Sequence, residues 1–332
     1  MIDSGVKSKQ KRRLAWTRER LLRERAIALG QAIDTSTWKN YGSALNSYLT
    51  FVRIHNFPVE PTADTISFFT VFMCHHIKPD SVDTYLSGIC QQLEPYFPSV
   101  REIRKSILCK HTLAGCKWLR GVPTKRKRAL TLSDLQTVID YYANSSSHDD
   151  LLFVSQLLTG FFAFMRLGEL TVSDDKSLFD YRKITSRTSL SLSADDYRFF
   201  LPSHKADKFF EGNIVIVQHH TGTIDPLSFF KKYLTSRDRL FPFHSDLWIR
   251  ADGSRPSRSF FIRQMRLFFE DDIAGQSMRA GGATSLAENG VPPHLIQAIG
   301  RWASPAFQIY IRKNPVLLQA LLFGRAAHDP LC

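Results

Sequence analysis

The chain has 332 residues, with 44 Lys or Arg against 31 Asp or Glu, so its formal net charge is +13. This length suits two domains that each bury a core, and the charge favours a polyanionic partner such as nucleic acid. The five cysteines are scattered without a CxxC pair, which is typical of reduced thiols and disfavours a zinc site or a disulfide framework. Since no apolar run approaches the length of a transmembrane helix, we expect a soluble intracellular protein.

The N-terminal segment is strongly basic. Residues 7–25 carry nine Lys or Arg side chains against two Glu side chains. We interpret residues 1–14 as a flexible arm, which is either a nuclear-import signal or a non-specific DNA contact, although a solvated tail has the same composition. The protein would then be nuclear in a eukaryote and cytoplasmic otherwise.

Residues 15–118 have the pattern of an all-helical domain. Thr35 or Ser36 is expected to cap a helix whose apolar residues recur at three- and four-residue steps. A second apolar helix is expected over residues 63–74, and a third begins near Ser81. The predicted apolar face of the first helix comprises Trp38, Tyr41, Leu45, Tyr48 and Val52.

Basic residues gather at the end of this domain and just after it. Residues 117–128 hold six Lys or Arg and no acid, and residues 119–128 are predicted to be the linker between the domains. Such a charge suits a phosphate backbone, although a solvated strap would have the same composition. The predicted DNA contacts are Arg101, Arg104, Lys105, Lys117, Arg120, Lys125, Arg126, Lys127 and Arg128.

Residues 129–332 are predicted to form a second, mostly helical domain. Thr131 or Ser133 is expected to cap a helix, and the apolar run 151–164 is expected to be a buried core helix. The hydrophobic period then changes to two, which indicates a small antiparallel sheet with strands at 189–193, 197–201 and 214–217. Helical patterns follow over residues 226–234, 260–269, 283–289, 293–299 and 315–323.

Two arginines and a tyrosine carry the chemical argument. Arg166 ends an apolar run, Arg279 precedes two glycines, and Tyr310 lies two residues before Arg312. Two fixed guanidiniums can hold the non-bridging oxygens of one phosphodiester, and a nearby tyrosine can attack phosphorus and store the bond as a phosphotyrosine. Each residue alone also fits a structural ion pair, a surface arginine or a core tyrosine. Together they indicate DNA strand breakage and rejoining.

Four segments, in this order along the chain, resemble the tyrosine recombinase (phage-integrase-like) family. The sequences Arg-x-Gly-Gly and Gly-Arg-Trp in the last two segments most resemble those of recombinases of eukaryotic mobile elements, such as Crypton-type transposons and DIRS-like retroelements. The four segments are Arg166-Leu167-Gly168-Glu169-Leu170, in which Glu169 supports the arginine; Lys205 between two strands; Arg279 with Gly281-Gly282; and Gly300-Arg301-Trp302 followed by Tyr310.

The resemblance implies a helical core-binding (SAM-like) domain followed by a mostly helical catalytic domain with a three-stranded antiparallel sheet. In the implied mechanism Tyr310 attacks a scissile phosphate of duplex DNA, giving a 3′-phosphotyrosine and a free 5′-hydroxyl. Arg166 and Arg279 neutralise the phosphate, and Lys205, with Lys208 as the alternative, protonates the leaving oxygen. No metal, cofactor or ATP is expected, because the ester conserves the bond energy. The rest of the phosphate cage would comprise Gln276, Arg301 and Trp302.

Two positions depart from the family pattern. Gln276 stands where the family usually has histidine, and either Arg301 or Trp302 stands near its usual His or Trp. An amide can donate a hydrogen bond to phosphate, but it is no acid or base near neutral pH. Two alternatives therefore stay open: a decayed or domesticated element that binds DNA without cutting it, and a type IB topoisomerase.

Paired acids suggest a further alternative, a metal-dependent nuclease, since two-metal enzymes use clustered carboxylates. Most of the pairs border Ser, Lys or Gly, which is typical of turns and helix caps. The four pairs lie at residues 149–150, 174–175, 195–196 and 271–272.

The apolar stretch 316–323 bears on assembly. In the family that this chain resembles, the corresponding tail docks on a neighbouring protomer, which implies a tetramer on paired DNA sites. Packing against its own domain is the alternative interpretation of the same residues.

Overall fold

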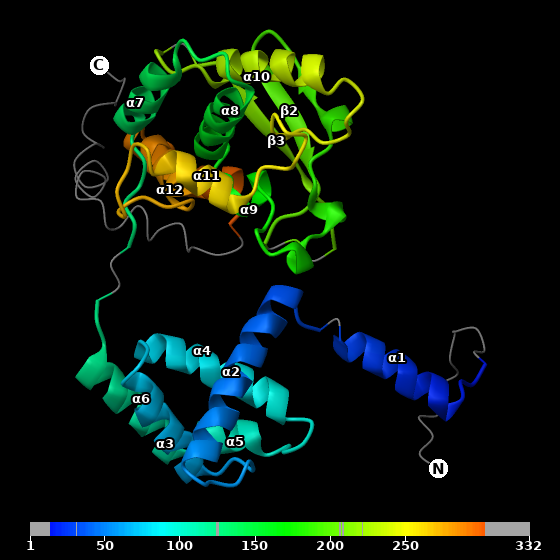
Figure 1. Cartoon of the computed structure of the whole chain (residues 1–332), viewed down its shortest axis with the longest axis vertical. Coiled ribbons are helices and arrows are strands. Elements are labelled where there is room, and N and C mark those ends of the chain that lie inside the picture. The colour runs from blue at the N-terminus through cyan, green and yellow to red at the C-terminus, as the bar shows by residue number, and fades with distance from the viewer. Residues whose placement is uncertain are drawn as a thin grey trace, which may run out of the picture. The chain divides into compact units, whose positions relative to one another are not determined.

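The computed structural model describes residues 14–30, 32–123, 126–205, 207, 209–220 and 222–302. The chain divides into two compact units, residues 1–124 and 125–332 (Figure 1). Tyr310, Lys125, Lys208 and the helix predicted over residues 315–323 lie outside the described residues. Within the described part, no helix is both long and apolar enough to cross a membrane.

In its described residues the first unit consists of helices and the turns that join them, with no strand. Its core combines aliphatic side chains with an aromatic cluster, in which Phe51 lies edge-on to Phe69 with ring centroids 5.5 Å apart. The first helix buries none of its residues, so it contributes nothing to this core. The helices are α1 (Arg18–Gly30), α2 (Thr35–Ile54), α3 (Ala63–Cys74), α4 (Pro79–Leu93), α5 (Val100–Lys105) and α6 (Ile107–Arg120).

Two details of α2 differ from the prediction. The cap is Asp34, whose carboxylate accepts a hydrogen bond from the backbone N–H of Ser36 at 2.9 Å, so Thr35 and Ser36 already lie inside the helix. Trp38 is 52% exposed because the buried face begins at Ala44 and continues through Tyr48 and Val52. The bounds predicted for α3 are confirmed.

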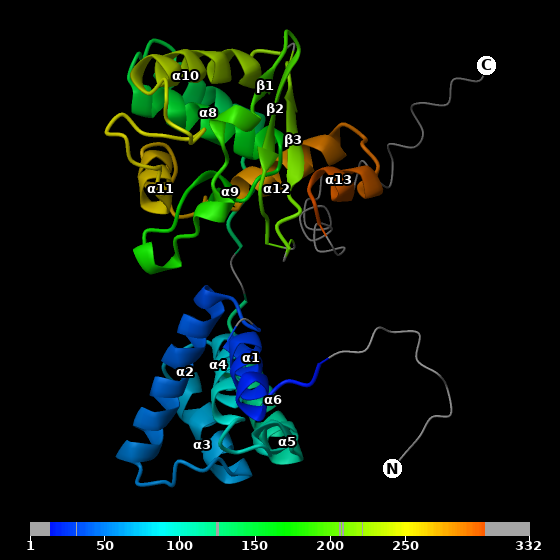
Figure 2. The same ribbon diagram turned by 90° about the vertical axis from the view of Figure 1, so that its right-hand side faces the viewer.

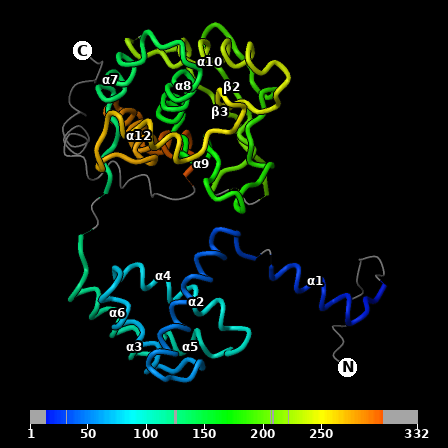
Figure 3. Tube along the Cα trace, in the orientation of Figure 1, coloured from blue at the N-terminus to red at the C-terminus, as the bar shows by residue number. Residues whose placement is uncertain are grey.

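The second unit surrounds one long buried helix. Figures 1 and 3 show α8 between α10 and α12, and both helices pack against it. The elements are α7 (Leu132–Tyr142), α8 (His148–Phe162), α9 (Leu167–Leu170), η1 (Lys176–Leu178), η2 (Tyr181–Lys183), η3 (Arg187–Ser189), β1 (Ser191–Leu192), β2 (Asp196–Leu201), β3 (Asn213–Gln218), α10 (Pro226–Leu240), α11 (Arg258–Met265), α12 (Ser277–Glu288) and α13 (Pro293–Ile299).

The sheet is antiparallel with the order β1-β2-β3, which confirms the small three-stranded sheet. Phe199 pairs with Val215 across β2 and β3, and both side chains are buried, as the two-residue period requires of one core-facing side. Tyr197 stacks on Phe230 of α10 with centroids 3.9 Å apart. Figure 2 shows α8 and α10 on the same side of the sheet.

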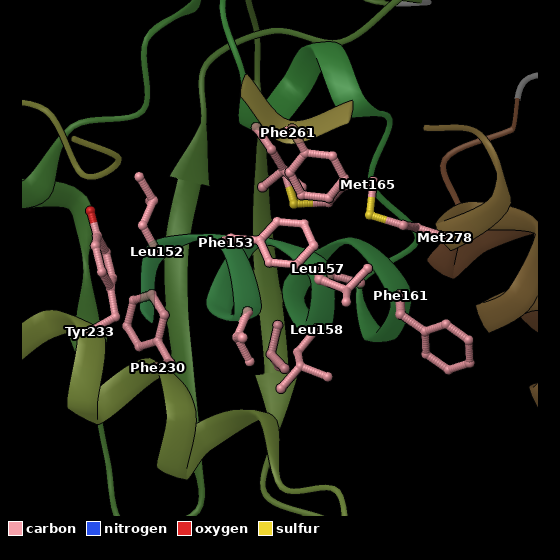
Figure 4. Packing of buried hydrophobic residues seen from close by; sticks show 14 of the residues in the cluster. Leu152, Phe153, Leu157, Leu158, Phe161, Met165, Phe230, Tyr233, Phe261 and Met278 are labelled. Carbon is pink, nitrogen blue, oxygen red and sulfur yellow. The ribbon is translucent and has the colours of Figure 1, made fainter. Parts of the chain in front are cut away.

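The core helix α8 is buried around most of its circumference (Figure 4), which confirms the core helix predicted there. It begins at His148 and ends at Phe162, and Thr131 caps the preceding α7 through a capping box with Asp134. The predicted start of α12 at residue 283 is wrong, because the helix begins at Ser277. Gly281 and Gly282 lie inside this helix.

Those glycines let α12 approach the backbone of its neighbours. A Cβ added at Gly282 would overlap the carbonyl oxygen of Phe161 and the ring of Phe164, and one at Gly281 would overlap the carbonyl oxygen of Leu130. A helix with larger residues at these positions could not come so close. The approach places Arg279, which precedes them in α12, beside the end of α8.

We expect Gly282→Ala to destabilise the second unit by about 1–3 kcal/mol, because the added methyl overpacks a backbone contact that cannot yield. Gly42→Ala in α2 is the matched control, since its Cβ would meet nothing within 4 Å. This control should raise stability by up to about 1 kcal/mol. Thermal unfolding of the full chain measures both, and equal midpoints for the two variants would contradict the close approach.

Candidate active site

Arg166 lies where the chain leaves the core and turns into α9. The turn is sharp, since Phe164 adopts a left-handed φ of 51°. The backbone N–H and the Nη1 of Arg166 both donate to the carboxylate of Glu169, at 3.0 and 2.9 Å. The Glu169 side chain is 5% exposed and that of Arg166 30% exposed. A buried carboxylate therefore fixes the guanidinium while part of it still reaches solvent.

Arg301 shares the same carboxylate. Its Nη2 lies 3.4 Å from Glu169 Oε2 and 3.4 Å from the carbonyl oxygen of Ala163. Burial lowers the pKa of the Arg301 guanidinium, the charge of Glu169 opposes this shift, and the like charge of Arg166 adds to it. Two guanidiniums thus meet at one carboxylate, an arrangement that leaves one positive charge uncompensated and favours a bound anion.

Arg279 is held by backbone carbonyls from two distant segments. It is 4% exposed, and its Nη1 donates to the carbonyl oxygen of Phe164 at 2.6 Å, while its Nη2 donates to that of Gly300. Its guanidinium carbon lies 4.1 Å from the centroid of the Trp302 ring, a cation–π distance. The ring of Trp302 therefore lies against the guanidinium of Arg279, whereas the side chain of Arg301 reaches Glu169.

These contacts bring three sequence-predicted arginines into one cluster with Glu169, defined here as the arginine cluster: Arg166, Arg279 and Arg301. Phe164 connects Arg279 with Arg166. Its carbonyl oxygen accepts a hydrogen bond from Arg279, and the residue lies in the turn that precedes Arg166. Three guanidiniums and one carboxylate sum to +2. Fixed guanidiniums of this kind are suited to the oxygens of a phosphate.

Gln276 is exposed and lies immediately before α12, three residues ahead of Arg279. Its backbone carbonyl accepts the N–H of Ala280 at 3.1 Å, which fixes the start of the helix. The sequence placed this residue near the second arginine, and the structure puts it at the N-terminal end of the same helix. Its amide is thereby open to solvent.

Lys205 is exposed in the connection between β2 and β3. The carboxylate of Asp207 shapes this connection by accepting the backbone N–H groups of Phe209, Glu211 and Gly212 at 3.1, 3.2 and 2.9 Å. Those hydrogen bonds lower the pKa of Asp207, the one from Gly212 most of all. Lys205 therefore lies in a connection between two strands whose far end is held by the hydrogen bonds of Asp207.

Several of the predicted DNA contacts in the first unit have protein partners. Arg101 binds Glu94 at 2.7 Å and Arg104 binds Asp83 at 2.8 Å. Lys117 lies within ion-pair distance of both Asp80 and Asp83, Arg120 Nη2 lies 2.8 Å from His75 Nε2, and Lys105 is exposed. Part of the positive charge counted in the sequence is thus balanced within α4 to α6.

The basic stretch before α7 is likewise anchored at its end. Arg128 donates to Asp134 and to Asp272, at 2.6 Å in each case, and both acids raise the pKa of its guanidinium, Asp134 more strongly. Lys127 donates to the carbonyl oxygen of Asp271. Arg126 remains exposed.

The paired acids serve structural contacts. Asp149 binds Arg250 at 2.8 Å, Asp174 accepts the backbone N–H of Ser259 at 3.1 Å, and Asp272 binds Arg128. Over the described ranges, no group of three or more His, Cys, Asp or Glu side chains could hold a metal ion. The four cysteines in those ranges are buried free thiols: Cys74, Cys90, Cys109 and Cys116.

Comparison with known proteins places the fold. No family model and no curated protein matches the sequence. Among solved structures, the XerH site-specific recombinase in a post-cleavage complex with difH substrate is 16% identical, with a TM-score of 0.61 over 86% of this chain and 78% of that one. The Tn1549 transposon integrase with transposon right end DNA is 11% identical, with a TM-score of 0.56 over 93% and 98%.

A lambda integrase dimer bound to a core site is similar as well, with 16% identity and a TM-score of 0.53 over 89% of this chain and 94% of that one. At such identities the likeness concerns the fold. The mainly helical chain with its small antiparallel sheet therefore has the tyrosine recombinase fold, which confirms the fold expected from the sequence.

Glu169→Ala should lower the stability of the second unit by about 3 kcal/mol, because it leaves the buried Arg301 guanidinium without its acid. Glu94→Ala is the control, since it also removes the partner of an arginine, but from a pair in which both side chains are about 40% exposed. Its unfolding midpoint in urea should stay close to that of the unaltered protein. If the two variants lose equal stability, Glu169 does not hold the arginine cluster together.

Proposed function

We propose that the protein is a site-specific DNA recombinase or transposon integrase that cuts and rejoins DNA through a 3′-phosphotyrosine. The arginine cluster supports this most strongly, because Arg166 and Arg301 meet at the buried carboxylate of Glu169 and Arg279 is held by the carbonyl of Phe164, in a chain with the tyrosine recombinase fold. The solved structures of similar fold include DNA complexes of a recombinase and of a transposon integrase. The sequence resemblance to Crypton-type and DIRS-like elements leads us to propose a eukaryotic mobile element as its source.

In the proposed reaction the Tyr310 hydroxyl loses its proton to solvent as its oxygen attacks phosphorus, and the bond from phosphorus to the 5′-oxygen breaks. Arg166 and Arg279 neutralise the charge that grows on the non-bridging oxygens, a contribution typically worth several kcal/mol. Lys205 gives its proton to the departing 5′-oxygen. Rejoining reverses these steps with another 5′-hydroxyl, so the ester carries the bond energy and neither ATP nor a metal ion is needed.

The other residues of the proposed phosphate cage have different parts. Trp302 keeps the guanidinium of Arg279 in place by lying against it, and Arg301 adds positive charge beside Arg166. Gln276 can donate its amide N–H to a phosphate oxygen. The split between Arg301 and Trp302 follows from the left-handed φ of 55° at Arg301, which turns consecutive side chains in different directions.

Double-stranded DNA is the proposed partner, contacted by the exposed basic residues Lys105, Arg120 and Arg126 and by the ion-paired ones after exchange of partners. Counterion release would then make binding weaken steeply with salt. We further propose a tetramer on paired sites through the apolar residues 316–323, and nuclear import through the basic arm of residues 1–14. Both of these rest on sequence alone.

A second function remains a candidate: a domesticated protein that binds DNA without cutting it. Gln276 favours this alternative, because an amide cannot replace histidine as an acid or base. The two functions differ in one observable, a covalent bond between protein and DNA. A nicked suicide substrate traps that bond. The short piece of DNA between the cleavage site and the nick carries the free 5′-hydroxyl, and it diffuses away before it can rejoin.

We expect Tyr310→Phe to abolish the covalent complex and to leave duplex binding within about twofold, because only the attacking oxygen is lost. The substrate is a nicked DNA duplex from the boundary of the proposed mobile element. Denaturing gels detect the covalent protein–DNA adduct, and gel shifts measure duplex binding. Tyr181→Phe, which changes an exposed tyrosine in η2, is the control and should cleave normally. An adduct formed equally by Tyr310→Phe would reassign the nucleophile, and its absence from the unaltered protein would favour the binding function.

A further inference from the structure

The connection between β2 and β3 is organised around one residue, Asp207. Its carboxylate accepts the backbone N–H of Phe209 at 3.1 Å. Its own backbone N–H donates to the carbonyl oxygen of His204 at 2.9 Å, and Lys205 lies between the two residues that this bond joins. Lys205 and Phe209 are therefore both tied to Asp207. Their four-residue separation spans at most about 14 Å of extended chain, and these hydrogen bonds shorten that distance.

Packing after Asp207 leaves the ring of Phe209 in solvent. The next residue, Phe210, adopts a left-handed φ of 59°, and its ring lies 4.4 Å from the guanidinium carbon of Arg182. Gly212 then brings the chain close to β2, because a Cβ at this position would overlap the ring of Phe200. Phe209 itself is 84% exposed. The connection thus holds one phenyl ring against the protein and the preceding one in water, where an apolar side chain is unfavourable.

The proposed reaction brings duplex DNA to this connection. If Lys205 protonates the leaving 5′-oxygen, the scissile phosphate lies within reach of its side chain. The backbone of Phe209 then lies within about four base-pair steps of that of Lys205, since each step rises about 3.4 Å. A phenyl ring cannot hydrogen-bond a phosphate or a base edge. It can stack on a base, or wedge between two base pairs and unstack them.

We propose that Phe209 enters the duplex beside the cleaved phosphate and unstacks a base step there. This inference rests on the proposed function and adds a distortion of the DNA that neither the arginine cluster nor Lys205 supplies. An apolar wedge forms no hydrogen bond with any base, so its selectivity follows the ease with which a step unstacks. Pyrimidine–purine steps deform most readily. The target DNA should therefore carry one within about four base pairs of the cleaved phosphate.

The fluorescence of 2-aminopurine tests this directly, because the base is quenched while it is stacked. The probe is an intact duplex from the boundary of the proposed mobile element, with 2-aminopurine placed in turn at each position near the cleaved phosphate. Tyr310→Phe keeps this DNA uncleaved. We expect binding to raise the fluorescence at one position by about twofold or more. Adding Phe209→Ala should abolish the rise, whereas Phe209→Tyr, which keeps the ring, should preserve it. Phe243→Ala is the control, because it removes a phenyl ring that is 99% exposed but lies outside this connection.

Cleavage provides a second measurement. In the protein that retains Tyr310, Phe209→Ala should slow formation of the covalent adduct by about tenfold or more, the effect of losing one contact between an aromatic ring and a base. A mismatch at the unstacked step should restore most of that rate, because it lowers the cost of unstacking. If the protein binds and cleaves the duplex but the fluorescence does not rise, or rises equally with Phe209→Ala, the wedge is wrong and the proposed function stands. A protein that neither binds nor cleaves the duplex would remove the proposed function and the wedge with it.

Discussion

The candidate site depends on one close contact between helices. Gly281 and Gly282 allow α12 to touch the backbone at the end of α8, and this approach carries Arg279 to the carbonyl oxygen of Phe164. A guanidinium buried this deeply requires hydrogen-bond acceptors on several sides. The Phe164 and Gly300 carbonyls provide two of them, so segments more than a hundred residues apart are tied to one side chain.

Contacts within the protein fix the charges of the arginine cluster before any ligand binds. Glu169 binds two guanidiniums, and Trp302 lies against a third. Holding three like charges together is unfavourable in water, and the protein offsets it with one buried carboxylate, backbone carbonyls and an aromatic face. The guanidiniums that carry the remaining positive charge are held in fixed positions. Such preorganised charges are what strong electrostatic stabilisation of a charged transition state requires.

Local patterns predicted the elements well where packing agreed with them. The helix over residues 63–74 and the second and third strands follow directly from apolar spacing, and the bounds of α3 are those predicted. The first strand, predicted over residues 189–193, is shorter, because β1 comprises only Ser191–Leu192 and Ser189 belongs to η3. The prediction was wrong where tertiary contacts decide. Helix α12 begins at Ser277 and not at residue 283, Asp34 and not Thr35 or Ser36 is the cap of α2, and Trp38 is exposed.

Of the candidate site, the sequence could indicate which residues but not how they are held. The supporting acid Glu169 was predicted from its three-residue spacing to Arg166, whereas its contact with Arg301 spans 132 residues and leaves no local pattern. The main-chain acceptors at Phe164 and Gly300 were equally invisible, because any residue type supplies a carbonyl. The partners of Arg104 and Lys117 in α4 show why a count of basic residues overstates the charge available to DNA.

The most direct test of the central claim replaces one charged oxygen of the scissile phosphate with a methyl group. Arg166→Ala and Arg279→Ala would be assayed on matched phosphate and methylphosphonate suicide substrates. If these arginines neutralise charge on the non-bridging oxygens, each variant should lose about a hundredfold or more in cleavage rate on phosphate and far less on the neutral methylphosphonate. An equal loss on both substrates would show that the arginines do not act on that charge and would contradict the account.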